Sequence, residues 1–425
     1  MIHSLSIRNF LSFKNEVTIS FEATKDKNLE AEHVYEVAAG VRLLKFLILY
    51  GYNASGKSNL IEAFQFLRDF WFTTTDDKDE EIKVEPFLLD DTSREKPSDF
   101  KLVFYKDKTK YAYYLSVREN IVLHEKLDFY PGVQPAVIFD RTFKNGVSVI
   151  NFGNKIKVSP VAKDEITIRC LPNISVFASY NQVNVNIGEL NKAVNWMKIN
   201  MMPKIEPNTK LQDYTNNLVA NSGEVKKHVL EYLQKADFNI ASIVTKAIDK
   251  TISDEFLSMV KTSDIPIKEL ERLEKERTIK ILQTDFSHKI VENGEINEYP
   301  LPIRKQSEGT KRVFGLSGAI YKALEQNAFL AIDEIESKLH PRLIEYVIEQ
   351  FLRQSEQSQL LVATHYDNLF DEDDLLRKDN FWFTEKNENG ATNLYPLSSF
   401  KGLGRISSFQ KAYKFGKFGA VPNID

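Results

Sequence analysis

Cysteine is nearly absent from this chain of 425 residues, which contains Cys170 and no other. A single cysteine cannot close a disulfide within the chain, so a disulfide-stapled fold is excluded. We expect Cys170 to be a small buried apolar residue, and the composition fits the reducing cytoplasm.

Long apolar runs are missing as well. No segment approaches the roughly 20 apolar residues that are needed to span a bilayer. The opening Met1-Ile2-His3-Ser4 does not have the pattern of a signal peptide. The sequence therefore predicts no membrane segment and no membrane partner.

A strong excess of either charge is also absent, because the formal net charge is −4 and the sequence pI is about 6.1. This average gives no indication of a nucleic-acid-binding protein. A local basic patch can still be hidden in such an average, so nucleic acid stays open as a partner.

The chain does contain alternating strand and helix patterns. Two short strands are expected within residues 2–21, a strand buried on both faces over 43–50, and an antiparallel meander over 100–150. From residue 307 the order is helix, strand, helix, strand, which implies a mostly parallel sheet covered by helices. The predicted class is α/β, with a mixed or parallel sheet, an antiparallel β-meander and a helical insertion.

Three regions follow from these patterns. Residues 1–180 are expected to form an N-terminal lobe, 181–276 a mostly helical insertion, and 277–425 a C-terminal lobe. The insertion is too short and too irregular in its heptads to be a long coiled coil.

The strongest motif is Gly51-Tyr52-Asn53-Ala54-Ser55-Gly56-Lys57-Ser58, which matches the phosphate-binding loop G-x-x-x-x-G-K-[ST] in full. Its glycines let backbone N–H groups face the phosphates, Lys57 is expected to reach the β- and γ-phosphates, and Ser58 to bind Mg²⁺. A buried strand before the loop and an amphipathic helix after it supply the required context. ATP and Mg²⁺ are the predicted cofactors, with nucleotide contacts from Asn53, Ala54, Ser55, Gly56, Lys57, Ser58 and Asn59.

An apolar strand pattern over 329–332 ends in Asp333 and Glu334. Two acids after a strand are common and can equally begin a helix. A complete phosphate loop earlier in the chain favours a catalytic pair instead. Asp333 is then expected to hold Mg²⁺, and Glu334 to polarise the attacking water as the general base.

Two further positions gain meaning from their order along the chain. Ser307 and Gly309 open the helix that precedes the acidic strand, where a serine is most often only an N-cap. His365 ends the strand that follows the acidic one, and a lone histidine is usually structural.

Taken together, these motifs resemble the ABC-type ATPases grouped with the overcoming-lysogenization-defect, RecF and SMC heads. The closest similarity is to the abortive-infection ATPases called AbiL- or RloA-like, whose relatives include the ATPase of PARIS defence systems. The resemblance spans nearly the whole chain. Its other parts are Ile7-Arg8-Asn9-Phe10, Pro86-Phe87, Pro97-Ser98-Asp99-Phe100, Leu339-His340-Pro341, and a tail of Tyr413, Gly416 and Gly419-Ala420-Val421-Pro422.

The resemblance implies roles that the residues alone do not. Ser307 and Gly309 would form the signature that binds the γ-phosphate of nucleotide held by another copy, and His365 would be the switch histidine that senses that phosphate. A homodimer or larger homo-oligomer with composite ATP sites is therefore expected. A Ser-Glu-Gly-Thr signature in place of the transporter type argues against a transporter subunit.

Two features of the family that the chain resembles have no match in this sequence: the Mg²⁺-linking glutamine and a Toprim domain. Neither Gln65 nor Gln182 is a convincing match to the glutamine that usually links Mg²⁺ to the insertion. The part after His365 is too short for a Toprim domain, so a nuclease effector would be a separate protein.

Three functions remain open. The first is the ATPase sensor of a prokaryotic anti-phage system that acts with a separate nuclease. The second is a DNA-maintenance ATPase resembling RecF, and the third is a slow ATP-dependent assembly scaffold.

Overall fold

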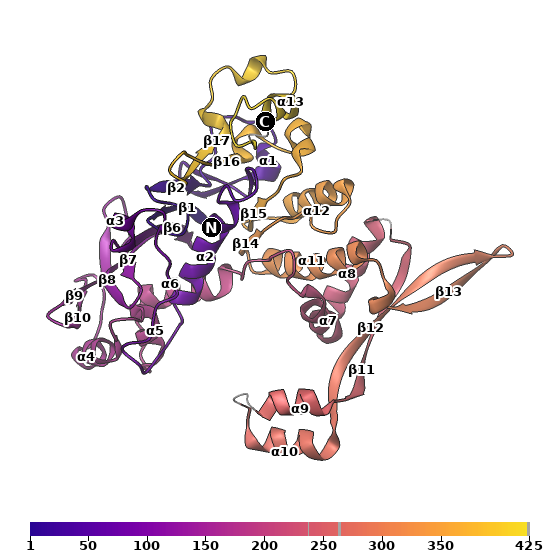
Figure 1. Cartoon of the computed structure of the whole chain (residues 1–425), viewed down its shortest axis with the longest axis horizontal. Coiled ribbons are helices and arrows are strands. Elements are labelled where there is room, and N and C mark those ends of the chain that lie inside the picture. The colour runs from indigo at the N-terminus through magenta and orange to yellow at the C-terminus, as the bar shows by residue number, and fades with distance from the viewer. Residues whose placement is uncertain (237, 262–264, 423–425) are drawn as a thin grey trace. The chain divides into compact units, whose positions relative to one another are not determined.

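The computed structural model describes residues 1–236, 238–261 and 265–422, and the chain divides into two compact units (Figure 1). The first unit comprises Met1–Pro207, Ala323–Ser337 and Ile344–Asp425. The second comprises Asn208–Lys322 and Lys338–Leu343. These boundaries differ from the expected ones at 180 and 276, because the chain leaves the first unit after residue 207 and returns to it at 323.

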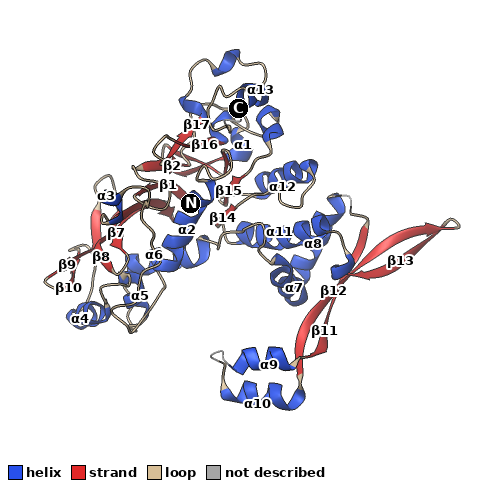
Figure 2. Cartoon of the chain, in the orientation of Figure 1, coloured by secondary structure: helices blue, strands red, loops and turns tan. Residues whose placement is uncertain are grey.

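The N-terminal half of the first unit is built on an antiparallel sheet with strand order β10-β9-β8-β7-β6-β1-β2 (Figure 2). Consecutive strands β6 to β10 pair in sequence order, which confirms the expected meander. The strands are β1 (Ile2–Arg8), β2 (Val17–Ser20), β6 (Ser98–Lys106), β7 (Thr109–Arg118), β8 (Ile121–Tyr130), β9 (Ala136–Lys144) and β10 (Val147–Phe152).

A second sheet in this unit has the order β14-β15-β5-β16-β17. Its first four strands are parallel and β17 is antiparallel, so the mostly parallel sheet is confirmed. The strands are β5 (Phe46–Tyr50), β14 (Phe329–Ile332), β15 (Gln359–Ala363), β16 (Phe381–Lys386) and β17 (Thr392–Pro396). Every residue of β5, β14 and β15 is buried, as a strand covered on both faces requires.

The expected single strand over 43–50 is wrong in one respect. The structure breaks it at Lys45, whose ammonium bonds the Ser355 carbonyl (2.8 Å). The residues before the break form β4 (Val41–Leu44), which pairs with β3 (Val34–Ala38) as a small antiparallel ribbon.

Helices surround both sheets of the first unit. They are α1 (Glu30–His33), α2 (Lys57–Phe70), α3 (Asp91–Arg94), α4 (Pro160–Arg169), α5 (Val176–Asn181), α6 (Gly188–Asn200), α12 (Pro341–Gln354) and α13 (Phe409–Lys414), with 3-10 turns η2 (Asp367–Asp371), η3 (Lys378–Asn380), η4 (Leu397–Ser399) and η5 (Leu403–Arg405). Stacked aromatic pairs fill the core, among them Trp71 with Phe177 (3.6 Å between centroids) and Phe104 with Trp196 (3.8 Å). Cys170 is buried here, as expected.

The second unit combines helices with a three-stranded antiparallel sheet of order β11-β12-β13. Its elements are α7 (Leu211–Asn221), α8 (Gly223–Lys235), β11 (Ile240–Thr251), α9 (Asp254–Lys261), α10 (Ile267–Glu276), β12 (Thr278–Glu292), β13 (Glu295–Pro302), η1 (Ile303–Lys305) and most of α11 (Glu308–Glu325). The region 181–276 is thus rich in helices, but it contains the 12-residue strand β11, which pairs with β12 after an excursion through α9 and α10. No helix in the described part of the chain is both long and apolar enough to cross a bilayer.

Candidate functional site

The phosphate-binding loop lies between β5 and α2, as its sequence predicts. Ala54 and Gly56 have left-handed φ values of 63° and 115°. Consecutive N–H groups in such turns face a common centre and make a concave anion site. A Cβ atom at Gly56 would lie 2.5 Å from Thr392 Oγ1, so this turn requires glycine.

Side chains from distant parts of the chain hold this loop from outside. The hydroxyls of Ser55 and Thr384 are 2.7 Å apart, and Thr392 Oγ1 lies 2.8 Å from both Ser55 O and Ser12 Oγ. Asn59 Nδ2 donates to the same Ser12 hydroxyl at 2.8 Å. The sequence-based prediction missed Ser12, Thr384 and Thr392, because no local pattern marks them. Asn59 is placed to shape the loop.

Lys57 begins α2 and points its ammonium back across the loop. Its Nζ donates to Gly51 O at 2.8 Å and lies 3.0 Å from His365 Nε2. The side chain is 6% exposed, and burial lowers the pKa of Lys57 to about 8 against the opposing pull of nearby carboxylates. The structure therefore brings together Lys57 and His365, which lie 308 residues apart.

Asp333 and Glu334 follow β14 directly, at the same end of the parallel sheet as the loop. Asp333 is buried and its Oδ1 accepts from the Glu334 N–H at 3.1 Å. Glu334 is exposed and has a left-handed φ of 45°. A glutamate in this conformation costs on the order of 1–3 kcal/mol, and such strain is concentrated at functional sites.

The backbone at the end of β15 is fixed by Glu336, another residue that sequence analysis missed. Its Oε1 accepts from the His365 N–H and its Oε2 from the Thr364 hydroxyl, both at 2.7 Å. Partial burial and the neighbouring Lys57 charge both lower the pKa of His365. The imidazole is therefore kept neutral beside the ammonium, so that its Nε2 can accept a hydrogen bond.

The residues present fit Mg·ATP. Asn53, Ala54 and Ser58 are exposed at the loop after β5, and Asp333 and Glu334 lie at the same edge of the sheet after β14, with β15 between the two strands. Among the residues described, no group of three or more carboxylate, imidazole or thiol side chains could hold a metal ion alone. Mg²⁺ bound with ATP needs only one or two protein ligands, because phosphate oxygens and water complete its octahedron.

The signature residues lie in the second unit. The Ser307 hydroxyl accepts from the Thr310 N–H at 3.1 Å, so it caps α11, and the residue itself is exposed. A Cβ atom at Gly309 would come within 3.1 Å of Lys338 O. The helix thus presents its N-terminus, where backbone N–H groups favour an anion.

The two glutamines lie in different settings. Gln65 Oε1 accepts from the Lys204 N–H at 2.8 Å, which joins α2 to the segment that runs alongside β14. Gln182 is exposed and is the C-cap of α5 through its backbone N–H. The side-chain bond to Lys204 accounts for the position of Gln65.

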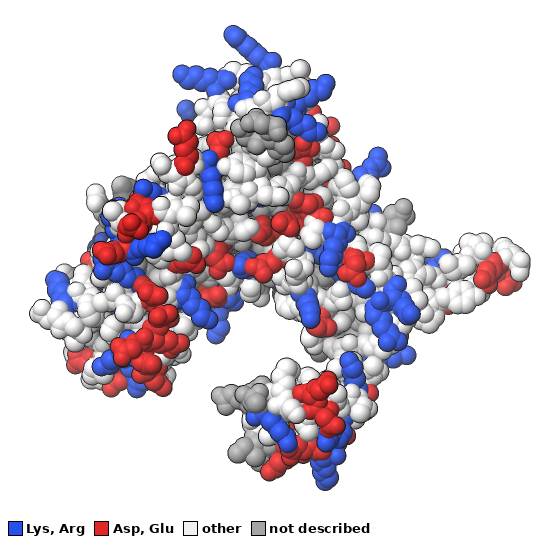
Figure 3. All heavy atoms as spheres, in the orientation of Figure 1, with Lys and Arg blue, Asp and Glu red and all other residues white. Residues whose placement is uncertain are grey.

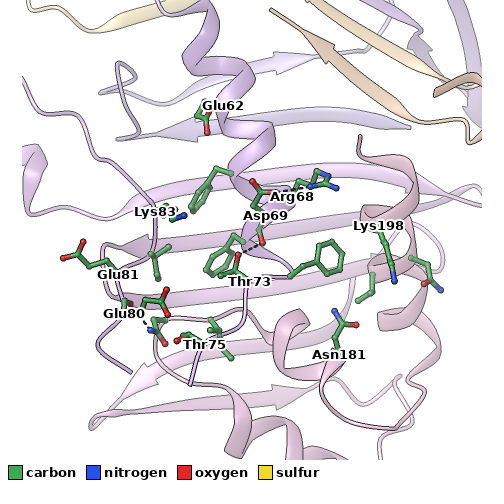
Figure 4. A pocket seen from close by; sticks show the side chains of 18 of the residues that line it. Glu62, Arg68, Asp69, Thr73, Thr75, Glu80, Glu81, Lys83, Asn181 and Lys198 are labelled. Atoms are coloured by element: carbon green, nitrogen blue, oxygen red, sulfur yellow. Dashed lines mark hydrogen bonds and ion pairs between the residues drawn. The ribbon is translucent and has the colours of Figure 1, made fainter. Parts of the chain in front are cut away.

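A cavity of about 970 Å³ lies along the later part of α2 (Figure 4). Figure 4 shows Glu80, Glu81 and Lys83 on one side of it and Lys198 with Asn181 on the other. Within α2 its lining begins at Glu62, so the cavity is separate from the loop at the start of that helix.

A family model described as "AAA domain, putative AbiEii toxin, Type IV TA system" matches residues 46–146 and 236–371, together more than half of the chain. The chain belongs to this AAA family. The match includes the phosphate-binding loop, Ser307, the Asp333–Glu334 pair and His365 of this AAA-family chain. No curated protein sequence matches the chain.

Solved structures of SMC heads resemble the chain at low identity. The SMC head domain from Thermotoga maritima has 13% identity and a TM-score of 0.40, covering 93% of this chain and 98% of that one. An SmcHead bound to the C-winged helix domain of ScpA has 16% identity and a TM-score of 0.40, with 97% and 99% covered. A Pyrococcus furiosus Smc head with an extended coiled coil, bound to the C-terminal domain of ScpA, has 13% identity, a TM-score of 0.39, and 98% of both chains covered.

Proposed function

We propose that this chain binds Mg·ATP and hydrolyses it. The observation that carries the proposal is the meeting of Lys57 with His365, Nζ to Nε2 at 3.0 Å, beside the Asp333–Glu334 strand end. A lysine, a neutral imidazole and two carboxylates at the ends of three neighbouring parallel strands form a site for phosphoryl transfer to water.

Each residue has a chemical task in this proposal. Lys57 and the loop N–H groups neutralise and hold the phosphates, and Ser58 and Asp333 hold the metal. When bound, the metal would stabilise the negative charge that develops on the phosphate oxygens of the leaving group. Glu334 is exposed, and no cation among the residues that the structure describes forms an ion pair with it, so its carboxylate is available to take the proton of the attacking water. His365, fixed by Glu336, contacts the phosphate end of the site.

The site is completed by a second copy of the chain in this proposal. Ser307 is exposed and caps the 18-residue helix α11, in which Gly309 is the second residue, and this helix N-terminus is chemically suited to a γ-phosphate. The partner's helix would then close over nucleotide held by Lys57. ATP would act as the bridge between two copies, in a homodimer or a larger assembly.

The biological role that we propose is the ATPase sensor of a prokaryotic anti-phage system, acting with a separate, Toprim-like nuclease. The description of the matched family, an AbiEii-type domain of a toxin–antitoxin system, supports a defence role. The AbiL/RloA-like motifs of the sequence agree with it.

The test is steady-state ATP hydrolysis and ATP binding by the Glu334→Gln variant. An amide has the shape of the carboxylate but cannot take the proton, so turnover should fall by at least about 100-fold while Mg·ATP stays bound. Glu349→Gln on α12, which removes a carboxylate that pairs with Arg353 at 2.6 Å, is the matched control and should hydrolyse ATP normally. Normal turnover by Glu334→Gln would move the base to another residue.

A further inference from the structure

The C-terminal segment 400–422 contains the tail motif that the ATPase site does not use. Its inner face packs against the sheet that carries the phosphate-binding loop. The ring centroid of Tyr413 lies 5.6 Å from that of Tyr50, the last residue of β5. The ring centroid of Phe418 lies 5.8 Å from that of Phe383 on β16. Packing therefore accounts for the buried aromatic residues of the segment.

Hydrogen bonds hold the segment in one conformation. Gly416, with φ of 73°, ends α13 in a Schellman motif, in which its N–H bonds Tyr413 O and the Lys417 N–H bonds Ala412 O. The Tyr395 hydroxyl donates to Phe418 O at 3.0 Å. A segment fixed in this way presents its outer side chains without a large ordering cost on binding.

The outer face is strongly basic. Residues 400–422 contain five cations and no acidic residue, whereas the whole chain has a net charge of −4. All five are exposed, and Figure 3 shows blue side chains gathered around this segment, at the top of the view. They are Lys401, Arg405, Lys411, Lys414 and Lys417.

Few of these cations form ion pairs. Lys414 pairs with Asp367 at 3.3 Å, and within the described residues no ion pair joins the other four. The Asp371 carboxylate interacts electrostatically with Lys411, and its oxygens also accept from the Ser408 hydroxyl and the Gln410 N–H.

An exposed aromatic residue, Phe415, lies between two of these cations in the sequence, Lys414 and Lys417. Phe415 is 87% exposed at the end of α13, while Phe409, Tyr413 and Phe418 in the same segment are at most 9% exposed. Leaving a whole phenyl ring in water forgoes about 1.5–3 kcal/mol of burial. A flat apolar face beside cations is the arrangement on which proteins stack unpaired bases.

We infer that this outer face binds single-stranded nucleic acid, with Lys401, Arg405, Lys411 and Lys417 on the phosphates and Phe415 stacked on a base. Stacking requires an unpaired base, so single strands are favoured over duplex. DNA and RNA share this chemistry. The inference does not depend on ATP hydrolysis, because no residue of the patch belongs to the nucleotide site.

The experiment measures fluorescence anisotropy of labelled dT20, U20 and a 20-base-pair duplex with the full chain from 50 to 200 mM salt. Four phosphate contacts on a single strand predict a slope of log K against log salt of roughly −2.8, or a loss of about 50-fold over this range. Lys411→Gln/Lys417→Gln should halve that slope. Phe415→Ala should weaken binding about 5- to 150-fold without changing the slope, and Phe415→Trp should restore it.

Lys25→Gln/Lys27→Gln removes two other exposed cations of the first unit and should leave binding unchanged. Whichever of dT20 and U20 binds more tightly identifies the natural strand. The inference is overturned if neither binds at 50 mM salt, if the duplex or polyglutamate binds as tightly as the single strands, or if the patch variants bind like the control. The Lys57→Ala variant has a damaged nucleotide site but an intact patch, so it should bind these strands like the wild type. Strand binding therefore tests the patch independently of the proposed ATPase activity.

Discussion

Glu336 gives the sharpest test of how the site is held together, because its two carboxylate oxygens hold the backbone of His365 and the side chain of Thr364. Each carboxylate oxygen accepts one hydrogen bond at 2.7 Å, from the His365 N–H and from the buried Thr364 hydroxyl. In Glu336→Gln the amide nitrogen cannot accept, so one of these donors loses its partner. A buried donor without a partner costs about 1–3 kcal/mol.

If that cost falls on the conformation that places His365 beside the phosphates, kcat should fall about 5- to 150-fold. The affinity for ATP should change little, because Lys57 and the loop remain in place. The assay is phosphate release at saturating ATP, together with binding of a fluorescent ATP analogue. The Glu349→Gln control also removes one negative charge, at a position on α12, and should keep full activity. A Glu336→Gln enzyme with wild-type kcat would refute the positioning argument, and one with lost ATP affinity would assign Glu336 to nucleotide binding.

Two further predictions concern binding and stability. Lys57→Ala should abolish ATP binding measured by calorimetry, because the phosphates lose their fixed cation; unchanged affinity in the folded variant would defeat the assignment of the loop. Burial lowers the pKa of His33 from its ordinary 6.5 to about 4, and the nearby Arg377 charge acts in the same direction, against the opposing effect of the hydrogen bond between Nε2 and Leu375 O. The folded state therefore favours neutral His33, so stability is complete above about pH 6.5 and declines as the pH falls toward 4. Between pH 7 and pH 5 this histidine should cost about 2 kcal/mol in the free energy of unfolding, and His33→Gln should show a correspondingly smaller decline in urea titrations.

The parts of the fold that depend on local pattern could be predicted from the sequence. The phosphate-binding loop between a buried strand and α2, the meander of β6 to β10, and the parallel strands β14 and β15 each have a signal within a short stretch of chain. The break at Lys45 could not be predicted, since the partners of this residue, among them Ser355 O and the Leu360 N–H, are brought to it only by folding. The division of the chain was also missed, because strand β11 pairs with β12 across two intervening helices.

The candidate site shows the same limit. In the sequence, Lys57 is marked by the complete phosphate-binding loop, and Asp333, Glu334 and His365 gain meaning from their order after that loop. Ser12, Thr384, Thr392 and Glu336 are ordinary residues whose importance comes from contacts made only after folding. Sequence motifs therefore name candidates for phosphate chemistry, whereas the residues that hold the loop and the end of β15 have no motif of their own.

The central claim, that one ATP site needs two copies of the chain, is tested most directly by mixing Lys57→Ala with Ser307→Arg. Each variant alone should be inactive, because both composite sites of its dimer are damaged. A mixed dimer carries both lesions in one site and leaves the other intact, so an equal mixture should recover up to about a quarter of wild-type hydrolysis. Normal hydrolysis by Ser307→Arg alone, or no recovery on mixing when mixed dimers have formed, would contradict the composite site.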